Sequence, residues 1–259
     1  MNISLFFDLH GWLAGAVLVF ARLAPVFFML PFLNGGVLSG APRTAVIVLT
    51  GLALWPSAAQ ALPMHDAFGF LLLIAREVAI GVALGGLLCW PFWVMHAMGN
   101  LIDNQRGAML SSTVDPASGS ETSELANFLQ LFGAVIYLAA GGMTLVLETV
   151  AQSYQLCSPE QACRFSVQPL LRFLDPLLGK VLLISAPVVG MLLLSEAMLG
   201  LLARYTPQLN AFSLSLAIKG PIALVVMLLY FGPYLPGEIL RMGSLVGSLG
   251  DWLAPAGAN

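Results

Sequence analysis

Charged residues are scarce in this chain. They make up only 9% of its 259 residues, whereas soluble domains carry about 25%. The ten Lys and Arg residues are scattered singly and the formal net charge is −3, so the sequence offers no basic face for nucleic acid. Hydrophobic residues reach 59%, and the mean hydropathy is +0.90. This composition predicts a polytopic membrane protein that contacts lipid and binds no nucleic acid.

Motifs of catalysis and of metal binding are also missing. The three histidines, His10, His65 and His96, are far apart, and none has the HExxH spacing of a metal site. The sequence contains no GxSxG elbow, P-loop or GxGxxG fingerprint. We therefore expect a protein that is not an enzyme and that holds no metal or cofactor.

Cysteine is rare too, with three residues in the chain. Cys89 lies in an apolar run and is interpreted as a small buried hydrophobe. Cys157 and Cys163 lie in a polar loop without the ligands that zinc requires. They are either two incidental thiols or a small disulfide loop, and a disulfide would place the loop on the oxidising periplasmic face.

Long hydrophobic runs, in contrast, fill most of the sequence. A spanning helix needs about 20 mostly apolar residues, and six candidates meet this length, at residues 9–32, 44–62, 68–98, 125–152, 177–203 and 208–232. Prolines inside several of them favour kinks. We predict an all-α membrane protein with about six long, kinked helices. Lys and Arg residues are divided equally between the two sets of loops, so the positive-inside rule assigns no orientation.

Several ionisable residues interrupt these runs. Within a span such residues are expected to face the protein interior, a wet cavity or a functional route. The set consists of Arg22, Arg76, Glu77, Glu148, Lys180, Glu196 and Lys219. Arg76 and Glu77 are adjacent, and side chains about 100° apart on a helix are not expected to pair with each other. Glu77, Gly81 and Gly85 share one face, where the small residues predict close approach of another helix.

Glu196 and Lys219 are predicted to form a pair. If the chain turns near residue 206, the two lie at similar depth, with a mismatch of about 4–5 Å. Three roles remain open for this pair. It is a buried ion pair that fixes a helical hairpin, a proton or ion relay, or a contact with partner subunits.

A polar island, residues 103–124, separates the third run from the fourth. Polar backbone at membrane depth persists only where it is buried in protein or lines a wet cavity. We interpret Asp103–Arg106 as a hinge or anchor, Gly107–Asp115 as a candidate pore-facing element, and Ser120–Glu124 as the cap of the next helix. An ordinary solvent-exposed loop is the alternative.

The stretch PFWVMHAMGNLIDNQRGAMLSSTVDPASGSETSELANFLQLF, residues 91–132, resembles the SpaR/SctT family of type III secretion export-apparatus proteins, close to its SpaR branch. Two further segments carry the resemblance, ARLAPVFFMLPFLNGGVLSGAPR near the start and LLLSEAMLGLLARYTPQLNAFSLSLAIK at residues 192–219. The combination of DNQRGA, a DPASG turn and an ETSE cap is the specific part. The resemblance covers essentially the whole chain.

This resemblance implies a single domain, residues 1–259, with an SctR-like part at about 1–175 and an SctS-like helical hairpin at about 176–259. It implies an injectisome virulence function, in which the chain joins SctR and SctS subunits in an inner-membrane pore complex that is partly raised toward the periplasm. Further implied partners are SctU, SctV and the unfolded secreted proteins, while energy comes from outside the chain.

In relatives, the loop after the third long segment projects into the pore and helps to close it. By position the corresponding residues here are Arg106, Gly107, Met109, Leu110, Ser111, Ser112, Thr113, Val114 and Asp115. The flagellar relative FliR carries bulky aromatics there, and this sequence does not.

Two other functions are compatible with the residues. A self-contained solute or ion transporter predicts symmetric halves, and the sequence shows no internal repeat. A scaffold that nucleates SctR and SctS assembly without contacting substrate is the other.

Overall fold

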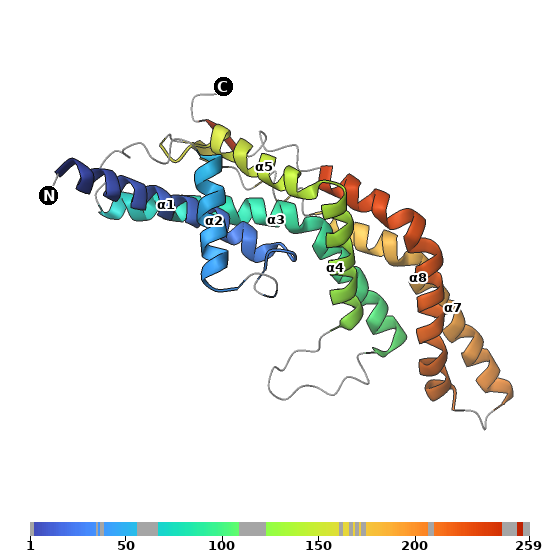
Figure 1. The fold of residues 1–259 in the computed structure, drawn as a ribbon. Coiled ribbons are helices and arrows are strands. Elements are labelled where there is room, and N and C mark those ends of the chain that lie inside the picture. Colours follow the sequence, from blue (N-terminus) through green and yellow to red (C-terminus); the bar gives the residue numbers. More distant parts are fainter. Residues whose placement is uncertain are drawn as a thin grey trace. The chain divides into compact units, whose positions relative to one another are not determined.

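In the computed structural model, seven helices account for nearly all of the described chain (Figure 1). The structure describes residues 3–34, 36, 39–55, 67–108, 123–160, 163–165, 168, 171, 175–206, 210–244 and 253–255. The helices are α1 (Ile3–Met29), α2 (Ala41–Leu54), α3 (Ala67–Arg106), α4 (Glu124–Ala139), α5 (Gly142–Leu156), α7 (Leu177–Tyr205) and α8 (Ala211–Ser244). Two strands of three residues each, β1 (Cys163–Phe165) and β2 (Leu253–Pro255), complete the described elements. The all-α class predicted from the sequence is confirmed, with this small sheet as an addition.

Four of the helices are long and apolar enough to cross a membrane, as expected of a multi-pass membrane protein. They are the Gly11–Met29 part of α1, α3, α7 and the Ser213–Gly243 part of α8. A fifth span exists if α4 and α5 count as one broken span. The expected number of about six is therefore approximate, because α2 has only 14 residues.

Local sequence explains where these helices stop. The helix α2 begins beside Pro42 and ends before Trp55, and the next residue, Pro56, disfavours a helical conformation for its predecessor. The break between α4 and α5 falls at Gly141, whose φ of 86° is readily adopted only by glycine. Proline lies inside α1, α3, α7 and α8.

The chain forms two compact units, each assembled from segments that are separate in the sequence. The first consists of Met1–Trp90, Leu138–Asp175 and Gly243–Asn259, and the second of Pro91–Tyr137 and Pro176–Met242. The division into an SctR-like part and an SctS-like part stays a prediction from the resemblance.

In the first unit, α1 packs directly against the N-terminal part of α3. A Cβ atom added at Gly81 would collide with the backbone carbonyl of Arg22, and one at Gly85 would lie 2.7 Å from Met29 Sδ. The close approach predicted for this glycine face is confirmed. The antiparallel sheet also belongs to this unit, with Cys163 opposite Pro255 and Phe165 opposite Leu253.

In the second unit, the C-terminal part of α3 packs on α4. A Cβ atom at Gly99 would collide with the backbone of Ala126, and the Phe92 and Tyr137 rings meet edge to face at 5.3 Å. The helices α7 and α8 form a hairpin, whose second helix begins after Asn210; the Asn210 side-chain oxygen accepts a hydrogen bond from the Ser213 amide.

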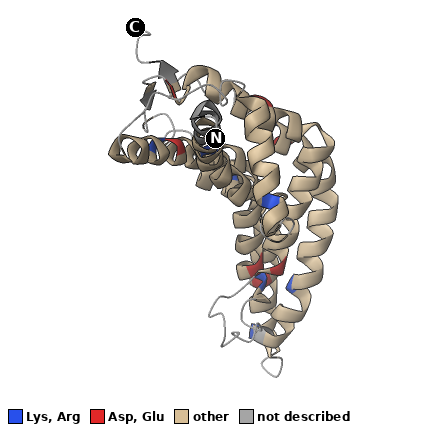
Figure 2. Ribbon diagram, turned by 60° about the vertical axis from the view of Figure 1, so that its left-hand side comes forward, with Lys and Arg blue, Asp and Glu red and all other residues tan. Residues whose placement is uncertain are grey.

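Charged residues occupy few positions along the helices (Figure 2). Large apolar side chains instead face outward, and several on α7 and α8 are more than half exposed, namely Leu178, Leu182, Leu183, Leu194, Met198, Leu201, Leu224, Val225, Leu228 and Leu229. Such an extent of exposed apolar surface is unsuited to water, and it marks contact with lipid or with other proteins.

Candidate functional site

A fully buried ion pair lies in the first unit. Arg22 of α1 and Glu77 of α3 have completely buried side chains, and Arg22 Nε lies 2.6 Å from Glu77 Oε2. The Arg22 guanidinium also lies 4.1 Å from the centre of the Tyr154 ring, a favourable cation–π arrangement. Because an isolated charge is costly in an apolar interior, Arg22 depends on these partners.

The C-terminal end of α5 supplies the remaining partners of Arg22. One terminal nitrogen donates to Ser153 Oγ at 3.3 Å, and the other donates to the Cys157 carbonyl oxygen at 2.8 Å. This carbonyl lies just beyond the helix end, where carbonyl groups lack an N–H donor within the helix. A cation is also favoured there by the helix dipole.

The expectation that Arg76 and Glu77 do not pair is wrong. Arg76 donates to Glu77 Oε1 at 3.1 Å, and the same nitrogen donates to the Ser158 carbonyl oxygen at 3.1 Å. The long arginine side chain reaches around the helix to its neighbour, so the angle between the two Cα–Cβ bonds does not decide the contact. The Arg76 side chain remains 26% exposed.

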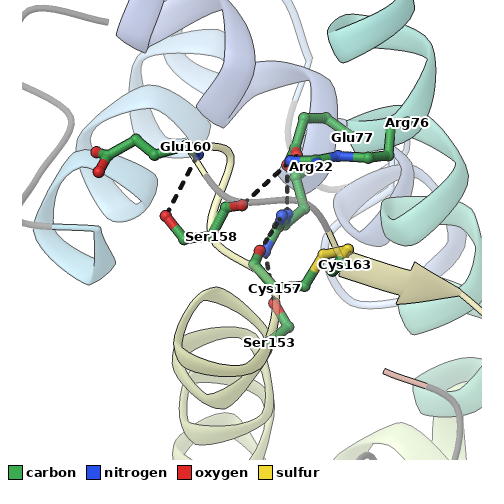
Figure 3. The surroundings of a disulfide bond; sticks show 8 residues. All are labelled: Arg22, Arg76, Glu77, Ser153, Cys157, Ser158, Glu160 and Cys163. Carbon is green, nitrogen blue, oxygen red and sulfur yellow. Dashed lines mark hydrogen bonds and ion pairs between the residues drawn. A yellow bond between two sulfur atoms is a disulfide. The ribbon is translucent and has the colours of Figure 1, made fainter. Parts of the chain in front are cut away.

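Cys157 and Cys163 are joined by a disulfide in the structure (Figure 3). Cys157 ends α5, with its amide bonded to the Ser153 carbonyl, and Cys163 begins β1. The bond therefore closes a short loop whose first two carbonyls, at residues 157 and 158, accept hydrogen bonds from Arg22 and Arg76. We call Arg22, Arg76, Glu77, Ser153 and the carbonyls of residues 157 and 158 the arginine cluster.

The two ends of the polar island are joined by one carboxylate in the second unit. Asp103, near the end of α3, accepts hydrogen bonds from Arg106 Nε at 2.6 Å, from Ser123 Oγ at 2.5 Å and from the Leu125 amide at 3.3 Å. Ser123 Oγ in turn accepts from the Ala126 amide at 3.0 Å, which caps α4. Asp103 therefore holds the last turn of α3 against the first turn of α4.

The chain turns sharply after this carboxylate. Gly107 has φ 76°, a conformation that favours glycine, and its amide bonds to the Asn104 carbonyl at 3.2 Å. Arg106, Gly107 and Ala108 line a hollow of about 170 Å³ together with Leu216 and Gly220 of α8. The other candidate pore-facing residues, Met109, Leu110, Ser111, Ser112, Thr113, Val114 and Asp115, lie outside the described residues.

Two ion pairs join α7 to α8. Lys219 Nζ lies 3.0 Å from Glu196 Oε2, so the predicted pair is present. The pair is not buried as a whole, because the Glu196 side chain is 56% exposed while that of Lys219 is 9% exposed. A second pair, between Lys180 and the nearly buried Glu238, was not predicted.

Sequence reasoning missed Glu238, Ser153 and Tyr154. Glu238 follows three prolines within α8 and lies beyond residue 232, the predicted end of that span, so it is not among the ionisable residues predicted within spans. Ser153 and Tyr154 carry no signal of their own, and only the packing of α5 against Arg22 reveals their roles. In the described part of the chain, no group of three or more His, Cys, Asp or Glu side chains is placed to hold a metal ion.

Comparisons with known proteins match nearly the whole chain. The family described as Bacterial export proteins, family 1, matches residues 13–240. The chain is 51% identical over 259 residues to the surface presentation of antigens protein SpaR of Salmonella typhimurium, covering 100% of this chain and 98% of that protein. It is 29% identical to the Yop proteins translocation protein T of Yersinia pestis, covering 82% and 84%. It is 24% identical to the flagellar biosynthetic protein FliR of Bacillus subtilis, again covering 82% and 84%.

Proposed function

Because the chain belongs to family 1 of the bacterial export proteins, and within it to the SpaR/SctT group of type III secretion, we propose that it forms part of the export pore in the inner membrane. In this proposal it assembles with SctR-type and SctS-type subunits. Unfolded effector proteins cross the membrane through the shared pore, and the loop at residues 106–115 contributes to closing it. The protein itself performs no catalysis.

The observation that carries this proposal is the match over nearly the whole chain to proteins of secretion and flagellar export. The Asp103 contacts support the role of the loop. A loop that closes a pore needs fixed ends, and one buried carboxylate joins its two flanking helices. The turn at Gly107 then directs the chain away from α3.

Glu196 supports the need for partner subunits. Its carboxylate is more than half exposed, and exposed Leu194 and Met198 lie near it in sequence on the same helix. A carboxylate that faces lipid is costly within a span. We infer that this side of α7 contacts a neighbouring subunit or a water-filled lumen. SctU-type and SctV-type proteins complete the proposed set of partners.

Site-specific photo-crosslinking with a stalled secretion substrate tests the pore. Crosslinkers at Met109 and Val114 should form adducts with the substrate, because both lie in the proposed pore-facing loop. A crosslinker at Leu229, an exposed apolar residue of α8, is the matched control and should form none. Adducts from the loop to SctR or SctS alone would favour a scaffold over a substrate-contacting pore.

Membrane permeability tests the closing role. Shortening residues 107–119 should let small molecules leak through the assembled complex. Asp103→Asn should leak as well, since it removes the charge that holds Arg106 and Ser123, while Ser123→Ala should have a smaller effect. Unchanged permeability with normal assembly would refute pore closure by this loop. Solute uptake by the purified chain alone would instead support the transporter.

A further inference from the structure

We propose that Cys157 and Cys163 are an oxidative modification site, the substrate of a disulfide-bearing thiol oxidase in the periplasm. Closing their bond completes the set of groups that accept hydrogen bonds from the buried Arg22. This inference uses only the membrane location from the proposed function, and it is independent of the pore. It assigns a chemical role to a loop that the export function leaves unused.

Arg22 has several hydrogen-bond donors that need acceptors. Its guanidinium has five N–H groups and is completely buried, so each donor that lacks a partner has an energetic cost. Glu77 receives the Nε–H group. The two terminal nitrogens depend on Ser153 Oγ and on the Cys157 carbonyl, and the carbonyl contact is the shorter at 2.8 Å.

The helix α5 and the disulfide together hold the Cys157 carbonyl in place. Cys157 is the last residue whose amide is bonded to α5, and its carbonyl points away from the helix toward Arg22 (Figure 3). The disulfide ties this residue to Cys163, the first residue of β1. The strand β1 is in turn paired with β2. The bond thus fixes the carbonyl from a second direction that the helix alone does not provide.

The disulfide also indicates the compartment in which this loop lies. Thiols in the cytosol are kept reduced, whereas disulfides persist in the periplasm. A disulfide that supports a buried charge cluster therefore places the C-terminal end of α5 and the β1–β2 sheet on the periplasmic side. This assigns the orientation that the loop charges could not decide.

The chemistry is a thiol–disulfide exchange. A thiolate of one cysteine attacks the disulfide of the oxidase, which forms a mixed disulfide and releases one oxidase thiolate. The second cysteine thiolate then attacks the mixed disulfide at the sulfur of the first cysteine and releases the other oxidase thiolate. Two electrons pass to the oxidase, its disulfide becomes a dithiol, and the two cysteine protons are transferred or released.

Burial fixes the order of events. Cys157 is only 1% exposed in the structure, so the oxidase has to act before this part of the chain packs around Arg22. Cys89 provides a contrast, because it is a free cysteine, fully buried within α3, and donates to the Met29 carbonyl. We expect it to stay reduced throughout.

A thiol-protection assay in intact cells tests the modification. The cells are quenched and denatured in acid, and every free thiol, including that of the buried Cys89, is then blocked with N-ethylmaleimide under denaturing conditions. Disulfides are reduced next, and the newly exposed thiols are counted by the gel shift of a maleimide–polyethylene glycol. Two protected thiols are expected in cells with the periplasmic thiol oxidase and none in cells that lack it; Cys163→Ser should show none in either. Free thiols in oxidase-containing cells, or a bond that forms equally without the enzyme, would overturn the proposal.

A double-mutant comparison tests the link to Arg22. Cys163→Ser breaks the bond and keeps the buried Cys157 sulfur. In the otherwise unchanged export complex it should shorten the half-life under limited proteolysis by about tenfold. In an Arg22→Met/Glu77→Leu background, where no buried guanidinium needs the carbonyl, the loss should be about twofold or less. Equal losses in both backgrounds would show that the bond acts only as a chain crosslink.

If Cys163→Ser fails to accumulate in the first background, accumulation in the second still supports the link, and failure in both refutes it. Secretion is measured separately in the same cells. Normal secretion without a disulfide would refute this inference and leave the export function intact. A disulfide in a chain that supports no secretion would support this inference and refute the export function.

Discussion

At the residue scale, two ion pairs of similar geometry differ in how much stability is lost when one member of the pair is removed. Arg22 and Glu77 are both completely buried, whereas Glu196, the partner of Lys219, is 56% exposed. Removing one member of a buried pair leaves a charge without compensation, while an exposed carboxylate regains other partners. Burial, and not the distance between the charges, sets the expected cost.

Arg22→Met should therefore destabilise the protein by about 3–5 kcal/mol. The double variant Arg22→Met/Glu77→Leu should recover a large part of this loss, since it removes both charges together. Lys219→Met is the matched control and should cost less than Arg22→Met, because its orphaned partner is exposed. Thermal unfolding of the detergent-solubilised full chain, in which no neighbouring subunit covers Glu196, measures all three. Equal losses for Arg22→Met and Lys219→Met would contradict this account.

At the element scale, α1 and α3 approach closely because glycine on α3 has no side chain at the contact. Gly81 lies against the backbone of Arg22, so any added carbon meets a main-chain atom that cannot rotate away. The same contact places Arg22 within reach of Glu77, one turn earlier on α3. The close packing of α1 on α3 and the buried Arg22–Glu77 ion pair therefore depend on each other.

Gly81→Ala should cost about 1–3 kcal/mol through this collision and should weaken export by displacing Arg22. Gly190→Ala in α7 is the control. A Cβ atom there meets nothing within 4 Å in the chain, and alanine favours a helix over glycine by about 0.5–1 kcal/mol. Unfolding midpoints of the two variants should move in opposite directions, and a Gly81→Ala protein as stable as the original would refute the close packing.

Much of this architecture is readable from the sequence, and the exceptions have physical causes. Hydrophobic runs locate the helices because lipid demands continuous apolar segments. They overcount spans because the apolar run at residues 44–62 is longer than α2, which ends at Leu54, shortly before a proline that disfavours a helical conformation at the residue preceding it. The pairing of Lys180 with Glu238 is not predicted from the sequence because the two residues are 58 positions apart. The β1–β2 pairing is not predicted either, because each strand is too short to show a periodic pattern.

At the scale of the whole molecule, the exposed apolar faces and the exposed Glu196 describe a subunit of a larger assembly. The hairpin of α7 and α8 turns leucine side chains outward along most of its length. Lipid is a favourable surrounding for the leucines but an unfavourable one for an exposed carboxylate on the same helix. Relatives in secretion and flagellar export agree with a chain that has protein partners in a complex.

A photo-crosslinker at position 196 tests this directly. In cells that produce the whole export apparatus, we expect an adduct with a second apparatus protein, because a neighbour covers the carboxylate. If a water-filled lumen covers it instead, Glu196→Cys should react with a water-soluble maleimide. A position that gives neither adduct nor labelling would face lipid and would contradict the proposed interface.

The length of α3 has a consequence for how the bilayer meets this protein. Its 40 residues extend about 60 Å along the helix, roughly twice the hydrocarbon thickness of a membrane. No tilt or local thickening accommodates that mismatch for a helix surrounded by lipid. A helix of this length needs protein or water around it in addition to lipid, so we expect the stability of the assembled complex to respond weakly to acyl-chain length. Membrane thickness affects the position and stability of ordinary spanning helices, and we expect it to affect α3 much less.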